Sequence, residues 1–365
     1  MHNLLNVMNK EFIKELLFAP SPSGYESAAR NVFLDYLVSL RTDKGPAKYE
    51  FTDAIGNCAV SVGDGKVPFM VSGHIDEIAL QVQYIDDDGF IHFIKDGGID
   101  PKSIVGQAVT IINDKLPENI KGVIGKKPIH IEYRGEDKDK AIKMTDMKID
   151  IGAESKEDAM KFVEVGNPII ISKNIFDLPC GNRIAGNGLD DKLGVAVTAE
   201  VIKRLAPYNL KHLKVYGVAC TQEEVGGYGA HIAAKRINPK YSIDYDVTFA
   251  TDDGFVDKKE WGDIKLGKGG AIAFGPDKNM GMCKQMIGIC KTKNIPYQTF
   301  SVGAGMTNTL KIKMASDDAK TMLLSIPNRN MHTPVEVCDY RDLDSLVDMT
   351  VEYILWLENY LSKNN

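Results

Sequence analysis

The chain has 365 residues, of which 44% are hydrophobic and 26% charged, a composition typical of a globular enzyme with one large domain plus an insertion or a second domain. Its formal net charge of -6 argues against nucleic acid as a partner, because phosphate binding requires a basic face. The sequence contains no apolar stretch long enough to span a membrane and no signal-peptide pattern, so we expect a cytoplasmic protein that does not bind membranes. Its six cysteines are scattered without a CxxC pair, which favours free thiols in a reducing compartment.

The first segment of the chain shows an α/β pattern. Apolar residues at helical spacing predict an amphipathic helix over 26–41, after the turn-forming sequence PSGYE. Three short strands are then predicted over 49–57, 58–65 and 67–74. The last strand is apolar on both faces, so we expect an interior strand with His74 at its C-terminal end.

From about residue 80 to 176 the pattern changes to short alternating strands separated by Gly, Pro and charged clusters. Such a pattern is typical of a small β-barrel or sandwich. One helix is predicted within this region over 155–163, with Ser155 as its N-cap. The predicted strands cover 81–85, 90–94, 107–112, 122–125, 128–133 and 163–172.

The α/β pattern resumes at residue 177. Helices are predicted over 190–206, 276–295 and 341–361, and strands over 213–221, 245–251, 295–302 and 319–327. The Gly-rich stretch 267–281 lacks the Lys-Ser/Thr ending of a phosphate loop, and we interpret it as a loop on the substrate side. We therefore predict a mixed-sheet α/β/α domain formed by residues 1–79 and 177–365, interrupted by a β-barrel-like insert over 80–176.

Side chains that commonly bind metal ions occur near the ends of several predicted elements. Imidazole and carboxylate groups together, without thiolates, suit zinc, cobalt or manganese. Their joint occurrence in separate α/β loops indicates a two-metal hydrolase. The candidates are His74 and Asp76 in SGHIDE, Asp190 and Asp191 in GNGLDDK, Glu223 and Glu224 in TQEEVGG, Asp246 at the start of YDVT, and His332 in NMHTPVE.

Each candidate also has a purely structural explanation. His74 could be a buried histidine bonded to a neighbour, and Asp190 and Asp191 could cap a helix N-terminus. The functional alternatives are that Asp76 accepts the second ring N–H of His74, and that Asp190 bridges two cations.

Glu223 and Glu224 form the most informative pair. Two adjacent acids are costly to place at a sheet end without partners, although a solvated turn would also accommodate them. Adjacent strand residues point to opposite sides, so one acid can bind metal while the other acts as a general base. Asp252 and Asp253 compete with Asp246 for its position, and His332 could be an ordinary loop histidine.

The order of these motifs resembles that of the TET-type aminopeptidases of metallopeptidase family forty-two, almost from end to end. The resemblance is carried by PSGYE, DAIGN, SGHIDEI, LDDKLG, QEEVG, DVT and IPNRNMHTPVEV, and within the insert by GVIG, KPIHI, MKIDIGAES and KEDA. It implies a dinuclear centre of zinc or cobalt, with manganese as the alternative. The implied roles are Asp190 as the bridge, His74 and Asp246 at one metal, Glu224 and His332 at the other, Glu223 as general base, and Asp76 as the support of His74.

The same resemblance implies an activity and an assembly. The expected reaction removes N-terminal residues from peptides by a metal-bridged water, whose proton Glu223 accepts. The insert is expected to be a dimerisation domain, and the dimers are expected to build a dodecamer. One departure concerns the GTDA-like segment of the family, which corresponds here to SVGAGMTNTL with Asn308 in place of the acid. This change leaves metal binding untouched and bears on substrate preference and on full activity.

Two other functional classes remain open at the level of the sequence. A glycoside hydrolase of the endoglucanase type needs two carboxylates but no metal cluster, which would leave both histidines without a role. A non-catalytic, metal-binding oligomeric protein would bind metal without peptide turnover, and Asn308 is the observation that motivates it.

Overall fold

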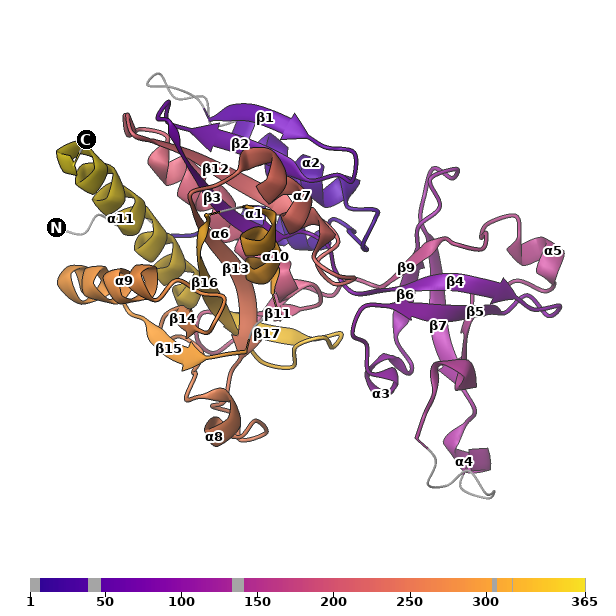
Figure 1. Cartoon of the computed structure of the whole chain (residues 1–365). Coiled ribbons are helices and arrows are strands. Elements are labelled where there is room, and N and C mark those ends of the chain that lie inside the picture. The colour runs from indigo at the N-terminus through magenta and orange to yellow at the C-terminus, as the bar shows by residue number, and fades with distance from the viewer. Residues whose placement is uncertain (1–6, 39–46, 133–140, 304–306, 317, 365) are drawn as a thin grey trace.

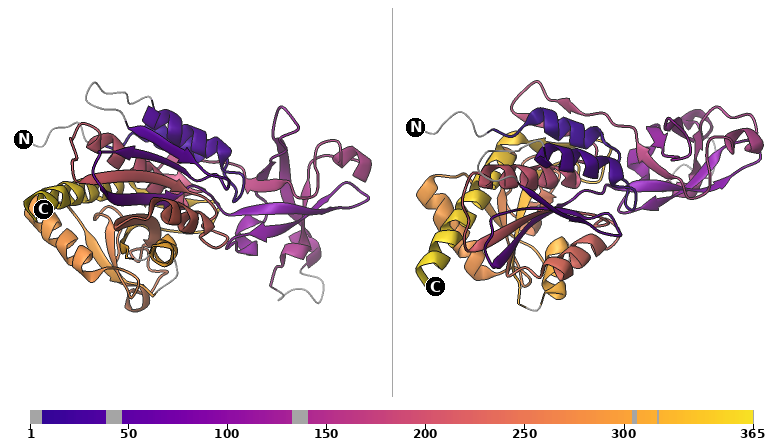
Figure 2. Two further views of the ribbon diagram at one scale, coloured as in Figure 1. Left: turned by 45° about the horizontal axis from the view of Figure 1, so that its top comes forward. Right: turned by 90° about the horizontal axis from the view of Figure 1, so that it is seen from above.

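The molecule has two parts, an α/β part and a β-barrel that projects from one end of it (Figures 1 and 2). The structure is a computed structural model and describes residues 7–38, 47–132, 141–303, 307–316 and 318–364. The predicted mixed-sheet α/β fold with an inserted barrel is confirmed. The division of the chain at residues 80 and 176 stays a prediction.

The α/β part is built on an eight-stranded mixed sheet. Its order is β1 (Lys48–Thr52), β2 (Cys58–Val62), β12 (Leu213–Cys220), β3 (Val67–His74), β13 (Tyr241–Phe249), β16 (Lys320–Asn328), β14 (Ala271–Phe274) and β15 (Gln298–Ser301). The four central strands β12, β3, β13 and β16 are parallel. Because parallel strands end at the same edge of a sheet, the segments that follow them meet there.

Helices cover both faces of this sheet, which gives the expected three layers (Figure 2). One face carries α6 (Leu189–Leu205), which lies against β3 and β13, together with α1 (Lys10–Phe18), α2 (Ser27–Val38), α9 (Met280–Lys293) and α11 (Tyr340–Asn364). The opposite face carries α7 (Tyr228–Ile237) and α10 (Asn308–Ala315). A short helix, α8 (Lys258–Trp261), follows β13. Among the described helices, none is long and apolar enough to cross a lipid bilayer.

The inserted part is a closed barrel with its own apolar core. Its strands follow the order β4 (Ala79–Ile85), β5 (Ile91–Asp96), β8 (Met147–Asp150), β7 (Ile120–Lys126), β6 (Ala108–Ile111) and β9 (Pro168–Ile171). Two short helices, α3 (Pro101–Ile104) and α5 (Lys156–Ala159), and a 3-10 turn, η1 (Met144–Asp146), lie in its connections. The N–H of Asp158 donates to the Ser155 hydroxyl at 3.2 Å, which confirms the predicted cap, although α5 is shorter than expected.

Two local predictions are wrong. The strand expected over 128–133 is the helical turn α4 (Ile129–Glu132), because Pro128 starts a turn in which its carbonyl accepts the N–H of Ile131 at 3.0 Å; residue 133 lies outside the described residues. The stretch 267–281 is not a substrate-side loop but contains β14. Its preceding glycines are held inside the α/β part, where the N–H groups of Gly267 and Gly269 each donate to Asp342 at 2.7 Å.

A buried charged cluster lies where the chain passes between the two parts. The carboxylate of Glu77, which precedes β4, accepts hydrogen bonds from the amino groups of Lys173 and, at 3.0 Å, Lys192. Lys192 also donates to the carbonyl of Ala19 at 2.6 Å. Burial lowers the pKa of Lys192 to about 7, and the nearby Lys173 acts in the same direction, whereas the Glu77 carboxylate opposes the shift. These bonds fix both crossings of the chain, because Glu77 and Lys173 flank the barrel in the sequence.

A small second sheet brings two distant segments together beside the main sheet. It consists of β10 (Phe176–Asp177), β11 (Arg183–Gly186) and β17 (Glu336–Asp339). Gly186 pairs with Glu336 in this sheet, immediately before the chain enters α6. The start of α6 therefore lies next to the segment that contains His332.

The contact between β3 and α6 depends on the absence of a side chain at Gly73. A methyl group there would lie 2.6 Å from the carbonyl carbon of Gly194 and 2.7 Å from the nitrogen of Val195. We predict that Gly73→Ala lowers the free energy of unfolding by about 1–3 kcal/mol, since helix and strand must move apart. Gly288→Ala on the exposed face of α9 meets nothing within 4 Å and is the matched control.

The control should be neutral or stabilising by up to about 1 kcal/mol, because alanine is the better helix former. Urea unfolding followed by circular dichroism measures both variants. Equal midpoints for Gly73→Ala and the natural protein would contradict this account of the β3–α6 contact.

Candidate metal centre

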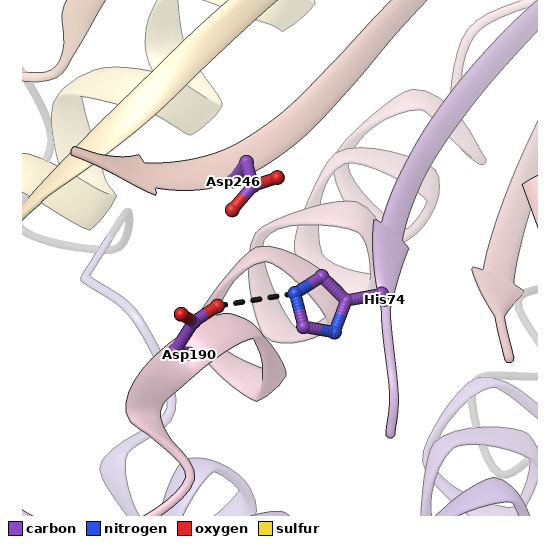
Figure 3. A group of neighbouring side chains, drawn as sticks. All are labelled: His74, Asp190 and Asp246. Atoms are coloured by element: carbon purple, nitrogen blue, oxygen red, sulfur yellow. Dashed lines mark hydrogen bonds and ion pairs between the residues drawn. The ribbon is translucent and has the colours of Figure 1, made fainter. Parts of the chain in front are cut away.

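The carboxylate of Asp190 lies at the middle of the candidate site. Its Oδ1 is 3.0 Å from Nε2 of His74, and its Oδ2 is 3.2 Å from Nε2 of His332. Asp190 stands at the start of α6, where its backbone is not helical. Figure 3 shows the Asp190 and His74 side chains pointing toward one another, with Asp246 nearby on β13. Each oxygen of this acid therefore faces a different imidazole.

The two adjacent acids of GNGLDDK have separate roles in the structure. Asp191 accepts the N–H of Gly194 at 3.1 Å, which is the capping interaction expected of an acid at a helix start. Its other oxygen accepts the N–H of His74 at 3.2 Å. The capping explanation is thus correct for Asp191, and Asp190 is left to face the histidines.

His74 is the last residue of β3, as predicted, and it is buried. Its Nδ1 lies 3.1 Å from the carbonyl oxygen of Asp76 and 3.5 Å from the Asp76 carboxylate. The Asp76 carboxylate also accepts the Ser23 hydroxyl at 2.6 Å. Asp76 therefore lies beside the ring nitrogen that faces away from Asp190, and this contact fixes the orientation of the imidazole.

Glu223 and Glu224 lie in a turn after β12, so the expectation that strand alternation separates them is wrong. Their two N–H groups both donate to the Asp76 carboxylate, at 2.9 Å and 3.2 Å. Oε1 of Glu224 lies 3.5 Å from Nε2 of His332. No hydrogen bond from a described residue reaches the Glu223 carboxylate, and Glu223 lines a cavity that opens onto the centre. The turn, held by Asp76, directs both acids toward the centre.

Asp246 lies in the C-terminal half of β13, so its predicted position at a strand start is wrong. The strand begins earlier because Tyr241, Ser242 and Ile243 also pair with β3. Potential ligand atoms of His74, Asp190 and Asp246 lie within 4.8 Å of one another. Asp252, which the sequence offered as an alternative to Asp246, instead accepts a hydrogen bond from the Arg329 side chain at 3.0 Å.

His332 lies in the loop between β16 and β17 and has a positive φ of 61°. Ligand atoms of Asp190, Glu224 and His332 form a second group within 4.8 Å, which shares Asp190 with the first. The Nδ1 of His332 donates to the carbonyl of Gly98 at 2.8 Å. Gly98 belongs to the connection after β5, so a barrel loop orients a histidine of the α/β part.

Glu336 is a buried residue that the sequence analysis did not single out. Its Oε2 accepts the N–H groups of Leu189 and Asp190, at 2.8 Å and 3.2 Å, and its Oε1 accepts the N–H of His332 at 3.1 Å. One carboxylate therefore holds the backbone of two site residues that are far apart in the sequence. The only local feature of the sequence that could have pointed to Glu336 is its position four residues after His332 in HTPVE.

The site contains more buried carboxyl groups than positively charged groups to balance them. Burial, together with Asp190, raises the pKa of Glu224 and of Asp246 well above their ordinary range, and burial with Asp76 raises that of Glu223. Burial opposes ionisation of Asp190 too, but hydrogen bonds from His332 and His74 lower its pKa. The bond to Asp190 raises the pKa of His332 to about 9. Divalent cations would replace these protons and balance the carboxylates.

A cavity of about 390 Å³ opens onto these groups, with the six histidines and acids of the centre in its wall. This volume is within the range of ligand-binding sites. Asn308, the departure from the family pattern, is buried at the first turn of α10 and does not line the cavity, although its neighbour Thr307 does. Its amide atoms have no partner among the described residues. Residues 304–306 of the same segment lie outside the described residues.

A protein-family model, the M42 glutamyl aminopeptidase family, matches residues 56–349. The chain belongs to the M42 peptidase family. It is 30% identical to the lysyl aminopeptidase of Pyrococcus furiosus, over 93% of this chain and 94% of the relative. The family and its aminopeptidase relatives make this protein a peptidase, and peptidases of this family depend on metal ions.

Solved structures of aminopeptidases share the fold. An aminopeptidase from the archaeon Desulfurococcus kamchatkensis superposes with a TM-score of 0.84 at 31% identity, over 94% of this chain and 93% of that one. The TET1 peptidase of Pyrococcus horikoshii gives a TM-score of 0.81 at 31% identity, over 94% of this chain and 98% of that one. That peptidase can assemble into a tetrahedron or a large octahedral shell. The likeness thus covers the barrel as well as the α/β part.

The raised pKa of His332 predicts a pH dependence for the metal-free protein. The folded pKa of about 9 exceeds the ordinary value of 6.5, so the stabilisation is complete below pH 6.5 and is lost as the pH rises through 9. The buried acids with raised pKa values act in the same direction. We expect the thermal midpoint, measured in chelator, to fall over this interval.

His332→Gln should flatten this dependence, while His231→Gln on α7 should leave it as it is. A midpoint that stays constant or rises between pH 6.5 and pH 9 would contradict the assignment.

The contacts of Glu336 predict a strong effect of a nearly isosteric change. In Glu336→Gln an NH2 group replaces one of the two carboxylate oxygens. This group cannot accept a hydrogen bond, so the backbone N–H of either Asp190 or His332 would lose its acceptor. We expect affinity for divalent metal ions to fall by about 10–100-fold, as is typical when supporting groups of a metal site are removed. Metal titration calorimetry measures the effect, and Glu154→Gln on the barrel is the control. Unchanged affinity would show that other contacts hold these two residues.

Proposed function

We propose that this protein is a dinuclear metal-dependent aminopeptidase that removes residues from the N-termini of peptides. The observation that carries the proposal is the sharing of Asp190 between two groups of potential ligands, His74 with Asp246 and Glu224 with His332. A single acid with one oxygen toward each group is the arrangement that a bridging carboxylate requires.

The donor set fits two divalent cations of borderline character. Nitrogen and carboxylate oxygen are available without a thiolate, which suits zinc or cobalt, with manganese as the alternative. The raised pKa values of Glu224 and Asp246 support the fit, because they reflect negative charge that the protein alone does not balance. When bound, the two ions would supply the Lewis acidity that activates water and polarises the scissile carbonyl.

Glu223 is the proposed general base. Its carboxylate lines the cavity, lies close enough to Asp190 and His332 to interact with their charges, and is raised in pKa by burial and by Asp76. A raised pKa suits a group that accepts a proton from water and returns it to the leaving amine. Asp76 is a positioning residue in this scheme, because it holds both the imidazole of His74 and the turn that carries Glu223.

We further propose a homo-oligomer in the cytoplasm, built from dimers into a dodecamer, with the barrel of residues 80–176 as the dimerisation domain. The assemblies formed by the TET1 peptidase support this proposal, since that protein shares both parts of the fold. Six unpaired cysteines, of which Cys180 is exposed, suit a reducing compartment.

The proposed roles of the adjacent acids predict different defects. Glu223→Gln should retain two metal equivalents and lose turnover by about 10²–10⁴-fold, because only the proton acceptor is removed. Glu224→Gln should lose affinity for one equivalent, because a ligand is removed. Metal analysis and hydrolysis of aminoacyl-anilides by metal-loaded protein separate the two effects. Near-normal turnover by Glu223→Gln would show that another group is the base.

A further inference from the structure

We infer that the enzyme prefers peptides whose N-terminal residue is large and apolar, such as leucine, methionine or phenylalanine. The inference rests on the proposed aminopeptidase function and concerns the wall of the same cavity. The wall beyond the charged centre consists largely of Val247, Phe249, Trp261, Phe300, Leu323 and Met331.

This apolar wall is built by four separate elements and by Met331 in the loop after β16. Val247 and Phe249 belong to the end of β13, Leu323 to the neighbouring β16, Phe300 to β15 and Trp261 to α8. The rings of Phe249 and Trp261 pack edge to face, with centroids 4.5 Å apart. Because Val247 follows Asp246 directly, the apolar wall begins next to the acid that faces His74. A side chain on a substrate bound at the centre would therefore contact it.

Charge is absent from the described part of this wall. The remaining described lining residues are Val302 and the hydroxyl-bearing Thr248, Thr307 and Ser325. Every ionisable residue among the described lining residues belongs to the centre itself. Within this described lining, a lysyl side chain would find no acid beyond the centre and a glutamyl side chain no base, so each would be desolvated without a partner.

The dimensions of the two cavities at the centre also favour this wall. A second cavity, on the side of the barrel, contacts Glu224 and His332 and is lined by Ile78, Leu80 and Ile104, but it holds only about 30 Å³. The cavity with Trp261, at about 390 Å³, is the one of the two that accommodates a large side chain.

The test is a panel of aminoacyl-anilides hydrolysed by metal-loaded protein, with Leu, Met, Phe, Ala, Lys, Arg and Glu at the N-terminus. We expect kcat/KM for the large apolar residues to exceed that for Lys and Glu by about tenfold or more. Trp261→Ala should lower kcat/KM for Phe and Leu but not for Ala. Trp261→Glu should shift the preference toward Lys and Arg by supplying the missing acid.

The second tryptophan supplies the matched control and an independent measurement. Trp356 lies on α11 and packs against Tyr353 and Tyr360, so Trp356→Phe should leave the preference unchanged. Combined with Glu223→Gln, this substitution leaves Trp261 as the only tryptophan. Its fluorescence should then respond to Phe-Ala at lower concentrations than to Lys-Ala, with turnover slowed by the Glu223→Gln substitution.

The possible failures are distinguishable. The specificity inference would be overturned if kcat/KM were highest for the Lys or Glu substrates and if substitution of Trp261 did not change the preference. This result would leave the aminopeptidase proposal intact. No turnover of any substrate by protein shown to hold both metal ions would overturn the proposed function together with the inference. Tighter binding of Phe-Ala than of Lys-Ala, measured by Trp261 fluorescence, would support the apolar wall as the binding surface.

Discussion

The buried carboxylate of Asp190 has one oxygen near each of two imidazoles, at 3.0 Å from His74 and 3.2 Å from His332. A buried acid is stable there only if its partners are held in place, because an unpaired buried charge is costly. The surrounding structure supplies that support. Asp191 holds the backbone of His74, Glu336 holds the backbones of Asp190 and His332, and the parallel sheet brings the ends of β3, β12 and β16 to one edge.

The groups that support the site are themselves acids, so an outer set of carboxylates surrounds the carboxylates of the centre. Asp76 uses its carboxylate on the two N–H groups of the Glu223–Glu224 turn, and Glu336 uses its own on the chain at Asp190 and His332. Glu224 and Asp246 line the cavity, although Oδ1 of Asp246 also accepts the N–H of its neighbour Val247 at 2.8 Å. The carboxylates in this small volume thus serve the backbone as well as the centre.

The sequence predicts what local patterns determine. The interior strand ending at His74 and the Ser155 cap follow from patterns within a few residues, and the barrel from alternating strands. The roles of Glu336 and Gly98 could not be predicted in this way, because their partners lie far away in the chain. The arrangement of Glu223 and Glu224 was inferred from strand alternation, but a turn held by Asp76 determines it. The apolar wall likewise combines residues from separate elements and required the structure.

The 2.8 Å bond from His332 to the carbonyl of Gly98 has an evolutionary consequence. A methyl group on Gly98 would lie 2.8 Å from that same ring nitrogen, so any larger residue at this position of the barrel loop would displace the imidazole. An inserted domain is often regarded as a module that can be lost or exchanged without damage to its host. Here the insert supplies an atom that orients a histidine of the host domain, so deletion or exchange would remove part of the site. The two parts are therefore expected to be inherited together.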